Sequence, residues 1–318
     1  MAVFKIVHIT KYQYNWPIKE SINEVRIFPH NFDNQDVLQY QLLITNNPVV
    51  EISKDYYGNR VGYFNTLKTH EEMTIESRML VRVNHSLKIP EIDSTTVKDL
   101  ENEKEKSITL LRLSYPETIE KQKKIISILK RMNSVDKPII EIAKQCNEYV
   151  FKNYTYTKGI TNIETTVDEL LEIKKGVCQD FARVLLQLLR TAGIPSRYVS
   201  GYICPNESGL RGEGATHAWV EFYTPTQGWL GLDPTNNIWT MDNYVKLSVG
   251  RNFCDCTPIK GTFKGFAKQT LSVSVSIGYE DGRQFEEINN VQLQEVTPEQ
   301  QAQLDYIEQL QYQQQQQQ

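Results

Sequence analysis

The sequence predicts an α+β protein in which an antiparallel β-sandwich domain precedes a core of helices and strands. Residues 1–90 contain several short segments of alternating apolar and polar residues with turn residues between them, which is typical of an antiparallel sandwich. Residues 177–189 place apolar side chains at helical spacing. Residues 216–223 and 228–236 are rich in β-branched and aromatic residues and flank the turn-forming residues 224–227, so they predict a hairpin.

The composition of the 318-residue chain is that of an ordinary soluble protein, with 40% hydrophobic and 23% charged residues. The net charge of −4 and the pI near 5.9 give no indication of binding to nucleic acid or to an anionic membrane. No apolar run approaches the roughly 18 residues of a membrane span, and Lys5 and His8 interrupt what would be the core of a signal peptide. Five cysteines, an odd number without framework spacing, indicate free thiols in a reducing compartment. We therefore expect a cytoplasmic protein without nucleic-acid or membrane partners, while its oligomeric state stays open.

We expect the chain to be divided into five parts. These are a β-sandwich domain (1–90), a charged connector that ends in a helix (91–137), the core (138–260), a C-terminal strand (261–285) and a glutamine-rich tail (286–318). In the connector, charges alternate in sign over residues 101–106, and a helix is predicted only at about 118–132. Residues 271–277 alternate like a half-buried strand. The tail is of low complexity and is expected to be disordered.

Two helices precede the centre of the core. The first spans about 138–151, opens with Pro138 near its first position and carries an apolar stripe that includes Cys146. The second spans 166–173, where Thr166 and Glu169 fit a capping box. Cys146 is therefore interpreted as core packing.

Cys178 follows a turn that opens at Gly176, and it begins the helix that ends near Gly193 and Pro195. At the start of a helix, unpaired backbone N–H groups and the positive end of the dipole stabilise a thiolate. A cysteine that only fills a gap in the core is the alternative for any single cysteine on a helix. The residues that accompany Cys178 favour a nucleophile.

His217 and Asp233 lie on the two strands of the predicted hairpin, with Pro225 midway between them in sequence. This spacing predicts that the two side chains lie opposite or diagonal to each other on one face. A slip of one residue in the register would put them on different faces. An imidazole that takes the thiol proton, and an acid that orients the imidazole, are what acyl transfer by a thiol requires.

No metal or cofactor site is predicted. His8, His30, His70 and His85 lack the spacing of metal ligands, and Cys254 and Cys256 form one Cys-x-Cys pair, in an expected loop, without a second pair. The glycines of residues 205–214 are too irregular for a phosphate-binding loop, and no Lys-Ser/Thr follows them. This segment is interpreted as either a flexible flap beside His217 or a plain exposed loop.

Several segments carry a family resemblance. They are GVCQDFA (176–182), AGIPSRYVSGY (192–202), HAWVE (217–221), GWLGLDPT (228–235) and, near the N-terminus, HITKYQY (8–14), RIFP (26–29) and DYYGNRV (55–61). In motif, order and spacing the chain resembles the bacterial transglutaminase-like family over most of residues 1–280. The resemblance implies a papain-like core with Cys178, His217 and Asp233 as a catalytic triad, preceded by the N-terminal β module of such bacterial proteins.

The expected function is a thiol-dependent hydrolase that acts on an amide bond of a peptide or protein through an acyl-enzyme. The backbone N–H of Cys178 is a natural oxyanion donor. Tyr156 and Gln179 are candidates for a second donor, and Asp180 for a supporting role. Two alternatives stay open: transfer of the acyl group to an amine, as in transglutaminases, and an inert binding protein on the same fold.

Overall fold

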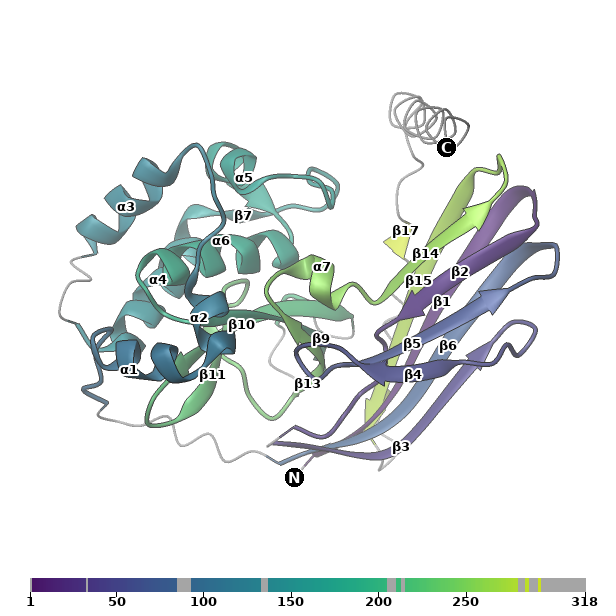
Figure 1. Ribbon diagram of the computed structural model, residues 1–318, viewed down its shortest axis with the longest axis horizontal. Coiled ribbons are helices and arrows are strands. Elements are labelled where there is room, and N and C mark those ends of the chain that lie inside the picture. Colours follow the sequence, from purple (N-terminus) through teal and green to yellow (C-terminus); the bar gives the residue numbers. More distant parts are fainter. Residues whose placement is uncertain are drawn as a thin grey trace.

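The computed structural model describes residues 2–32, 34–84, 93–132, 137–204, 210–212, 215–279, 284–285 and 291–292. Two β-sheets form one end of the molecule, and helices packed on a third sheet form the other (Figure 1). Apart from residues 291–292, the predicted glutamine-rich tail lies outside the described residues, as does His85.

The N-terminal domain is an antiparallel sandwich, as predicted. Its first sheet runs in the order β16 (Gln284–Phe285), β15 (Gln269–Tyr279), β1 (Ala2–Ile18), β6 (His70–Val83) and β3 (Gln35–Ile44), with β17 (Val291–Gln292) also paired to β15. Its second sheet runs in the order β14 (Ile259–Lys264), β2 (Glu20–Val25), β5 (Arg60–Thr66) and β4 (Glu51–Lys54). Side chains from both sheets, among them Ile18, Val25, Phe64 and Ile75, form one buried cluster between them.

The strand predicted at 271–277 forms within β15, but its partner is the first strand of the chain. Ile6 pairs with Ile277, and β14 pairs in the same way with β2. Residues of β14 and β15, which follow the core in sequence, therefore complete both sheets of the N-terminal sandwich. Such long-range pairing leaves no trace in the local sequence pattern.

The third sheet has the antiparallel order β12 (Ile238–Trp239), β11 (Gly228–Asp233), β10 (Thr216–Thr224), β9 (Ser196–Ile203) and β13 (Tyr244–Gly250). The helices α3 (Gln122–Arg131), α4 (Ile139–Asn153), α5 (Val167–Ile173) and α6 (Cys178–Thr191) gather on one side of this sheet (Figure 1). Their apolar stripes and those of β10 and β11 form one buried cluster. The predicted capping box at Thr166 and Glu169 is present at the start of α5.

The expectation of an irregular charged connector before residue 118 is wrong, because it contains α1 (Asp99–Lys106) and α2 (Ile108–Ser114). Lys104 pairs with Glu101 one turn away at 2.6 Å, so the alternating charges stabilise a helix rather than disrupt it. Leu100 is buried in the same cluster as the core helices, and the Ser107 side chain caps α2. Tertiary packing of single apolar residues thus outweighs the polar composition.

The third sheet also packs on the sandwich through an apolar cluster. Phe4, Ile6 and Val81 meet Tyr202 and Val245 there. At the edge of this sheet, Gln35 accepts a hydrogen bond from the N–H of Lys246 (2.8 Å) and donates one to its carbonyl oxygen (2.9 Å). In the same way, the Asn59 side chain accepts a hydrogen bond from the N–H of Val249 and donates one to its carbonyl oxygen. Two amide side chains of the N-terminal domain therefore satisfy backbone groups of β13 as a neighbouring strand would.

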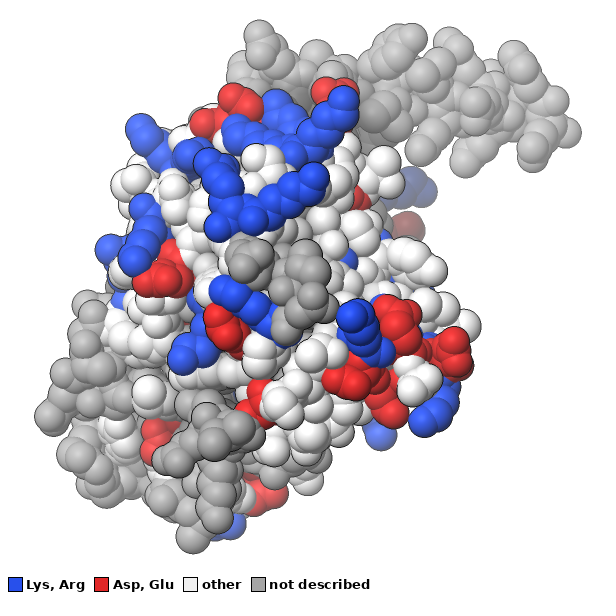
Figure 2. Space-filling model, turned by 90° about the vertical axis from the view of Figure 1, so that its left-hand side faces the viewer, with Lys and Arg blue, Asp and Glu red and all other residues white. Residues whose placement is uncertain are grey.

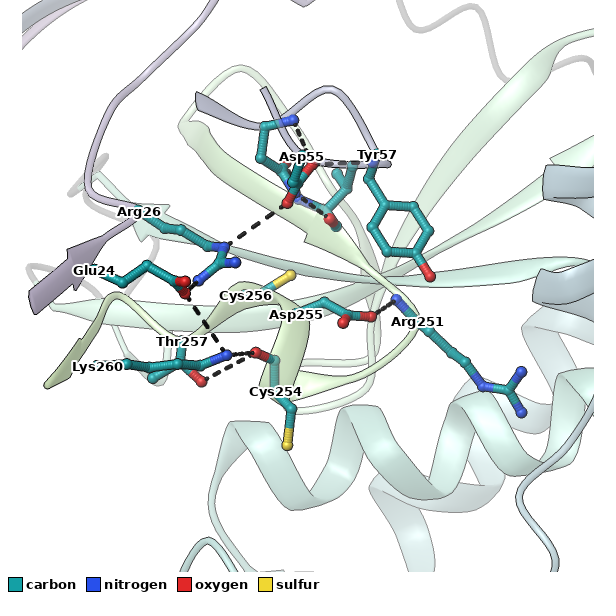
Figure 3. Close-up of polar contacts among 12 residues, drawn as sticks. Glu24, Arg26, Asp55, Tyr57, Arg251, Cys254, Asp255, Cys256, Thr257 and Lys260 are labelled. Atoms are coloured by element: carbon teal, nitrogen blue, oxygen red, sulfur yellow. Dashed lines mark hydrogen bonds and ion pairs between the residues drawn. The ribbon is translucent and has the colours of Figure 1, made fainter. Parts of the chain in front are cut away.

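The Cys-x-Cys segment lies in a short helix, α7 (Phe253–Cys256), rather than in the predicted loop. Figure 3 shows it between the core and the sandwich, where Lys260 reaches the carbonyl oxygen of Cys254 (2.5 Å) and Arg26 pairs with Glu24. Cys256 is buried and Cys254 is exposed. Among the described residues no group of three His, Cys, Asp or Glu side chains could hold a metal ion.

Lys and Arg side chains gather at the upper end of the helical side of the molecule, where α3 and α5 lie (Figures 1 and 2). Lys121 and Lys124 of this region pair with Glu172 of α5. In the part of the chain that the structure describes, no helix is both long enough and apolar enough to cross a membrane.

Candidate active site

The turn before Cys178 is held by Asp180. Its Oδ2 accepts hydrogen bonds from the backbone N–H of Val177 (2.8 Å) and from the Thr161 hydroxyl (2.6 Å). A Cβ on Gly176 would lie 2.4 Å from this oxygen, so only glycine lets the carboxylate close over the turn. Cys178 is thereby placed at the first position of α6, half-buried, where the backbone N–H groups have no partners within the helix.

The predicted hairpin forms from β10 and β11, with Thr224 paired to Gly228 and Val220 to Leu232. Continuing this register by one residue puts Asp233 across from Trp219, so His217 lies diagonally across on the same face. His217 Nε2 and Asp233 Oδ2 are 2.9 Å apart. Of the two arrangements left open by the sequence, the structure has the diagonal one.

The carboxylate of Asp233 is fully buried and surrounded by donors. Besides His217, its Oδ2 accepts hydrogen bonds from the Tyr244 hydroxyl (2.7 Å) and the Asn236 amide (2.8 Å), and its Oδ1 accepts one from the backbone N–H of Thr235 (2.8 Å). Burial alone would raise the pKa of Asp233, but the charge of His217 and these hydrogen bonds outweigh burial and lower it. The group is therefore an anion at neutral pH.

The ring of His217 is buried and its two nitrogens have different surroundings. Nε2 faces Asp233, whereas Nδ1 has no hydrogen bond of ordinary length and angle with any described residue. Burial by itself would lower the pKa of His217, but Asp233 and then the thiolate of Cys178, through charge and hydrogen bonding, raise it to about 10. The arrangement therefore favours a protonated imidazole beside the carboxylate of Asp233.

Tyr156 lies beside the Cys178 turn. It belongs to the short strand β7 (Thr155–Tyr156), which pairs in parallel with β8 (Lys175–Gly176), and its ring packs against Phe181. Burial and, after it, the charge of Cys178 raise the pKa of Tyr156 to about 12. Its hydroxyl is therefore protonated at neutral pH and can donate a hydrogen bond. Gln179 is half-buried in the first turn of α6.

Comparison with known proteins gives two family matches. Residues 126–234 match the model of the transglutaminase-like superfamily, and residues 4–82 match the bacterial transglutaminase-like N-terminal region. The chain therefore contains a transglutaminase-like core and a bacterial transglutaminase-like N-terminal region. The matched core contains Cys178, His217 and Asp233, and each of the two matches lies within one of the two domains described above.

Two uncharacterized relatives are similar to this chain over most of their length. Uncharacterized proteins of Mycobacterium tuberculosis and Mycobacterium leprae are each 29% identical to it, over 293 and 284 residues, covering 86% of this chain and 92% and 97% of theirs. A solved structure from Cytophaga hutchinsonii, whose name assigns it provisionally to the cysteine proteases, superposes with a TM-score of 0.68 at 18% identity, covering 91% of this chain and 96% of that one. This likeness shows the fold. A protein-glutamine gamma-glutamyltransferase of Pseudomonas aeruginosa is 38% identical over 90 residues, which cover 27% of this chain and 14% of that one.

Two residues of the site were not predicted from the sequence. Tyr244 lies on β13 and outside the matched core, so neither its position nor its neighbours in sequence indicated that its hydroxyl reaches Asp233. Asn236 lies three residues after Asp233, and this spacing is typical of an aspartate that accepts hydrogen bonds from the following turn. That signal could have been used.

Asn236 also links the loop before β10 to the site. It accepts a hydrogen bond from the backbone N–H of Arg211 (2.8 Å) and donates one to its carbonyl oxygen (3.0 Å). A Cβ on Gly212 would lie 2.7 Å from Nδ1 of His217, so this backbone runs directly over the imidazole. Of the segment predicted to be a flap or a loop, residues 205–209 and 213–214 lie outside the described residues.

Charged side chains near the site form ion pairs and hydrogen bonds that do not involve Cys178, His217 or Asp233. Arg197 pairs with Glu221 on β10 (2.5 Å), and Lys246 contacts the other oxygen of Glu221 (2.5 Å). Arg183 binds the carbonyl oxygen of Thr165 and the carboxylate of Glu117, one turn along α6 from the cysteine. These contacts fix the strand and the helix that carry the site.

Proposed function

We propose that this protein is a cysteine hydrolase of amide bonds in peptides or proteins, in which Cys178, His217 and Asp233 act as a triad. One observation carries the proposal. The Nε2 side of the buried His217 ring is bound to an anionic Asp233, which leaves Nδ1 available to the thiol of Cys178. An inert scaffold does not require a buried imidazole with one nitrogen committed to a carboxylate, the other without a hydrogen bond to a described residue, and the charge of Cys178 acting on the ring.

In the proposed reaction His217 takes the thiol proton, and the sulfur of Cys178 attacks the carbonyl carbon of the substrate. The resulting oxyanion accepts a hydrogen bond from the backbone N–H of Cys178. The C–N bond then breaks, His217 gives its proton to the leaving amine, and a thioester remains. Water, deprotonated by His217, attacks the thioester and releases the acid and the thiol.

Tyr156 is the better of the candidates for the second oxyanion donor, because its hydroxyl is protonated and its environment includes the Cys178 charge. Asp180 accepts hydrogen bonds at the turn, so its proposed role is to hold Cys178 in position. Replacing Tyr156 with phenylalanine should lower kcat by roughly 10–10³-fold with little change in KM. Steady-state kinetics test this, with Tyr149→Phe on α4 as the matched control. A Tyr156→Phe enzyme with unchanged kcat would exclude this donor.

The direct test is to trap the acyl-enzyme. The protein is incubated with a library of peptides and glutamine-containing peptides and quenched in acid, and its intact mass and peptide map are measured. We expect an adduct on Cys178 whose mass equals the acyl part of the substrate, and none in a Cys178→Ala variant. Absence of both an adduct and cleavage products from the wild-type protein would contradict the proposal.

Acyl transfer to an amine is the second candidate, and one observation favours it. The Pseudomonas aeruginosa relative that is 38% identical over 90 residues is named as a protein-glutamine gamma-glutamyltransferase. Both reactions share the thioester and differ in the group that attacks it. Adding a primary amine to the trapping experiment distinguishes them, because transfer gives an amide product of the amine and hydrolysis gives a free acid.

A further inference from the structure

Arg211 lies beside the His217–Asp233 pair and is held there by its backbone. Its N–H and carbonyl oxygen bind the side-chain amide of Asn236 (2.8 and 3.0 Å), and the same amide donates to Oδ2 of Asp233 (2.8 Å). The next residue, Gly212, is so close to His217 that an added Cβ would lie 2.7 Å from Nδ1. The backbone of residue 211 is therefore fixed relative to the groups that are proposed to react, and its side chain takes no part in fixing it.

The side chain of Arg211 is exposed and makes no ion pair with a described residue, in contrast to Arg197, which pairs with Glu221. The Cζ atom of Arg211 lies 5.7 Å from the centroid of the Phe151 ring, near the C-terminal end of α4. Its N–H donors are thus accessible to a ligand. Because most arginines of a protein are exposed, the neighbours of Arg211 decide whether it has a role.

The surroundings of Arg211 include groups that are proposed to react. Burial and then the charge of Cys178 raise the pKa of Tyr156, the proposed oxyanion donor, whereas the charge of Arg211 lowers it. Asp180 and Asp233 act on the same hydroxyl, but their oxygens accept hydrogen bonds from other groups and neither pairs with Arg211. The guanidinium is therefore an unpaired cation near the point where the scissile carbonyl is proposed to bind.

We infer that Arg211 binds a carboxylate of the substrate beside the scissile amide, so that the enzyme selects acidic peptides. The inference rests on the proposed function, because it assigns the substrate class of the same site. The planar guanidinium can donate two parallel hydrogen bonds to a carboxylate, and the Phe151 ring stabilises the cation. The net charge of −4 would otherwise repel such peptides. Either an acidic side chain or the free C-terminus of a peptide supplies the carboxylate.

Two alkylating reagents test the inference on the full chain without a substrate. Iodoacetate and iodoacetamide react with the same sulfur and release the same iodide, but only iodoacetate carries a carboxylate. Peptide mapping measures the rate at which each labels Cys178 at pH 7, and the ratio of the two rates cancels any change in the reactivity of the thiol. In Arg211→Gln the iodoacetate-to-iodoacetamide ratio should fall at least about fivefold. In Arg211→Lys, which keeps the charge, the ratio should stay within about threefold of wild type.

The matched control is Arg78→Gln, the same replacement at an exposed arginine on β6 of the N-terminal domain, and it should leave the ratio unchanged. A second measurement uses peptides that acylate Cys178 in the trapping experiment. They are resynthesised in pairs, with Glu or Gln beside the scissile amide and with a free or an amidated C-terminus. The acidic member of one pair should acylate the wild-type protein at least about fivefold faster and should lose this advantage in Arg211→Gln. The pair that shows the difference identifies the source of the carboxylate.

The inference is wrong if Arg211→Gln leaves the ratio of the two alkylation rates at the wild-type value, or if the acidic and neutral members of both pairs react alike. Alkylation breaks no amide bond, so its outcome is independent of the proposed reaction. An Arg211-dependent ratio without any acyl adduct would contradict the proposed function and not the carboxylate site. Normal acylation with an unchanged ratio would contradict the carboxylate site alone.

Discussion

Replacing Asp233 with asparagine is expected to lower kcat by roughly 10³–10⁴-fold while KM changes little. The variant loses the charge that stabilises the imidazolium of His217, so the pKa of His217 falls. The asparagine also cannot accept all the hydrogen bonds that Asp233 accepts. In the wild type, Oδ2 accepts from Tyr244 and Asn236, and Oδ1 accepts from the N–H of Thr235. An amide nitrogen in either position would face a donor.

The measurement is steady-state kinetics on the substrate found by acyl trapping, together with the rate at which iodoacetamide labels Cys178 at pH 6. Both rates should fall in Asp233→Asn. Tyr244→Phe is the matched control, because it removes one donor to the same carboxylate and keeps the charge, so its kcat should fall by only about tenfold. A thermal melt verifies that both variants are folded. An Asp233→Asn enzyme within tenfold of wild type would remove Asp233 from the proposed triad.

The difference between Asp233 and Tyr244 shows what local sequence can reveal about this site. His217 and Asp233 lie on neighbouring strands joined by a short turn, so the spacing around Pro225 permitted a pair on one face, and the observed register decides for it over a slip of one residue. Tyr244 lies on β13, which is separated from β11 in the sheet by β9 and β10. All seven residues of β13 are buried, so the strand has no alternation from which the direction of a side chain could be predicted.

The same reasoning applies to the fold. Alternation predicted several strands of the sandwich but not β4 or β14, and helical spacing predicted α4 and α6, because each pattern records which face of one element is buried. The pairing of β1 with β15 joins two strands that are separated in sequence by the whole core. The side-chain amides of Gln35 and Asn59 bind the backbone of β13, and no motif around these two residues indicates that they do so. Contacts of this kind depend on tertiary structure alone.

Replacing Glu221 with glutamine is expected to lower the free energy of unfolding by roughly 3–5 kcal/mol. Glu221 lies on β10, four residues from His217, and its buried carboxylate is shared by Arg197 and Lys246. The substitution keeps the volume but removes the negative charge between two largely buried cations, whose desolvation is then no longer offset. Urea unfolding at pH 7 measures the loss. The exposed pair of Lys11 and Glu72 (2.9 Å) supplies the control, because Glu72→Gln should cost no more than about 1 kcal/mol.

The pH dependence of this loss identifies its cause. Burial would raise the pKa of Glu221 above the 4.5 of an ordinary glutamate, but Arg197 and Lys246 outweigh burial and lower it to about 2. A carboxylate whose pKa is lower in the folded than in the unfolded state stabilises the fold above pH 4.5, and this contribution is lost as the pH falls toward 2. The stability gap between wild type and Glu221→Gln should therefore be constant from pH 7 to about 5 and should narrow below pH 4.5. A gap that stayed constant down to pH 3 would mean that the loss comes from altered packing on β10 rather than from the missing charge.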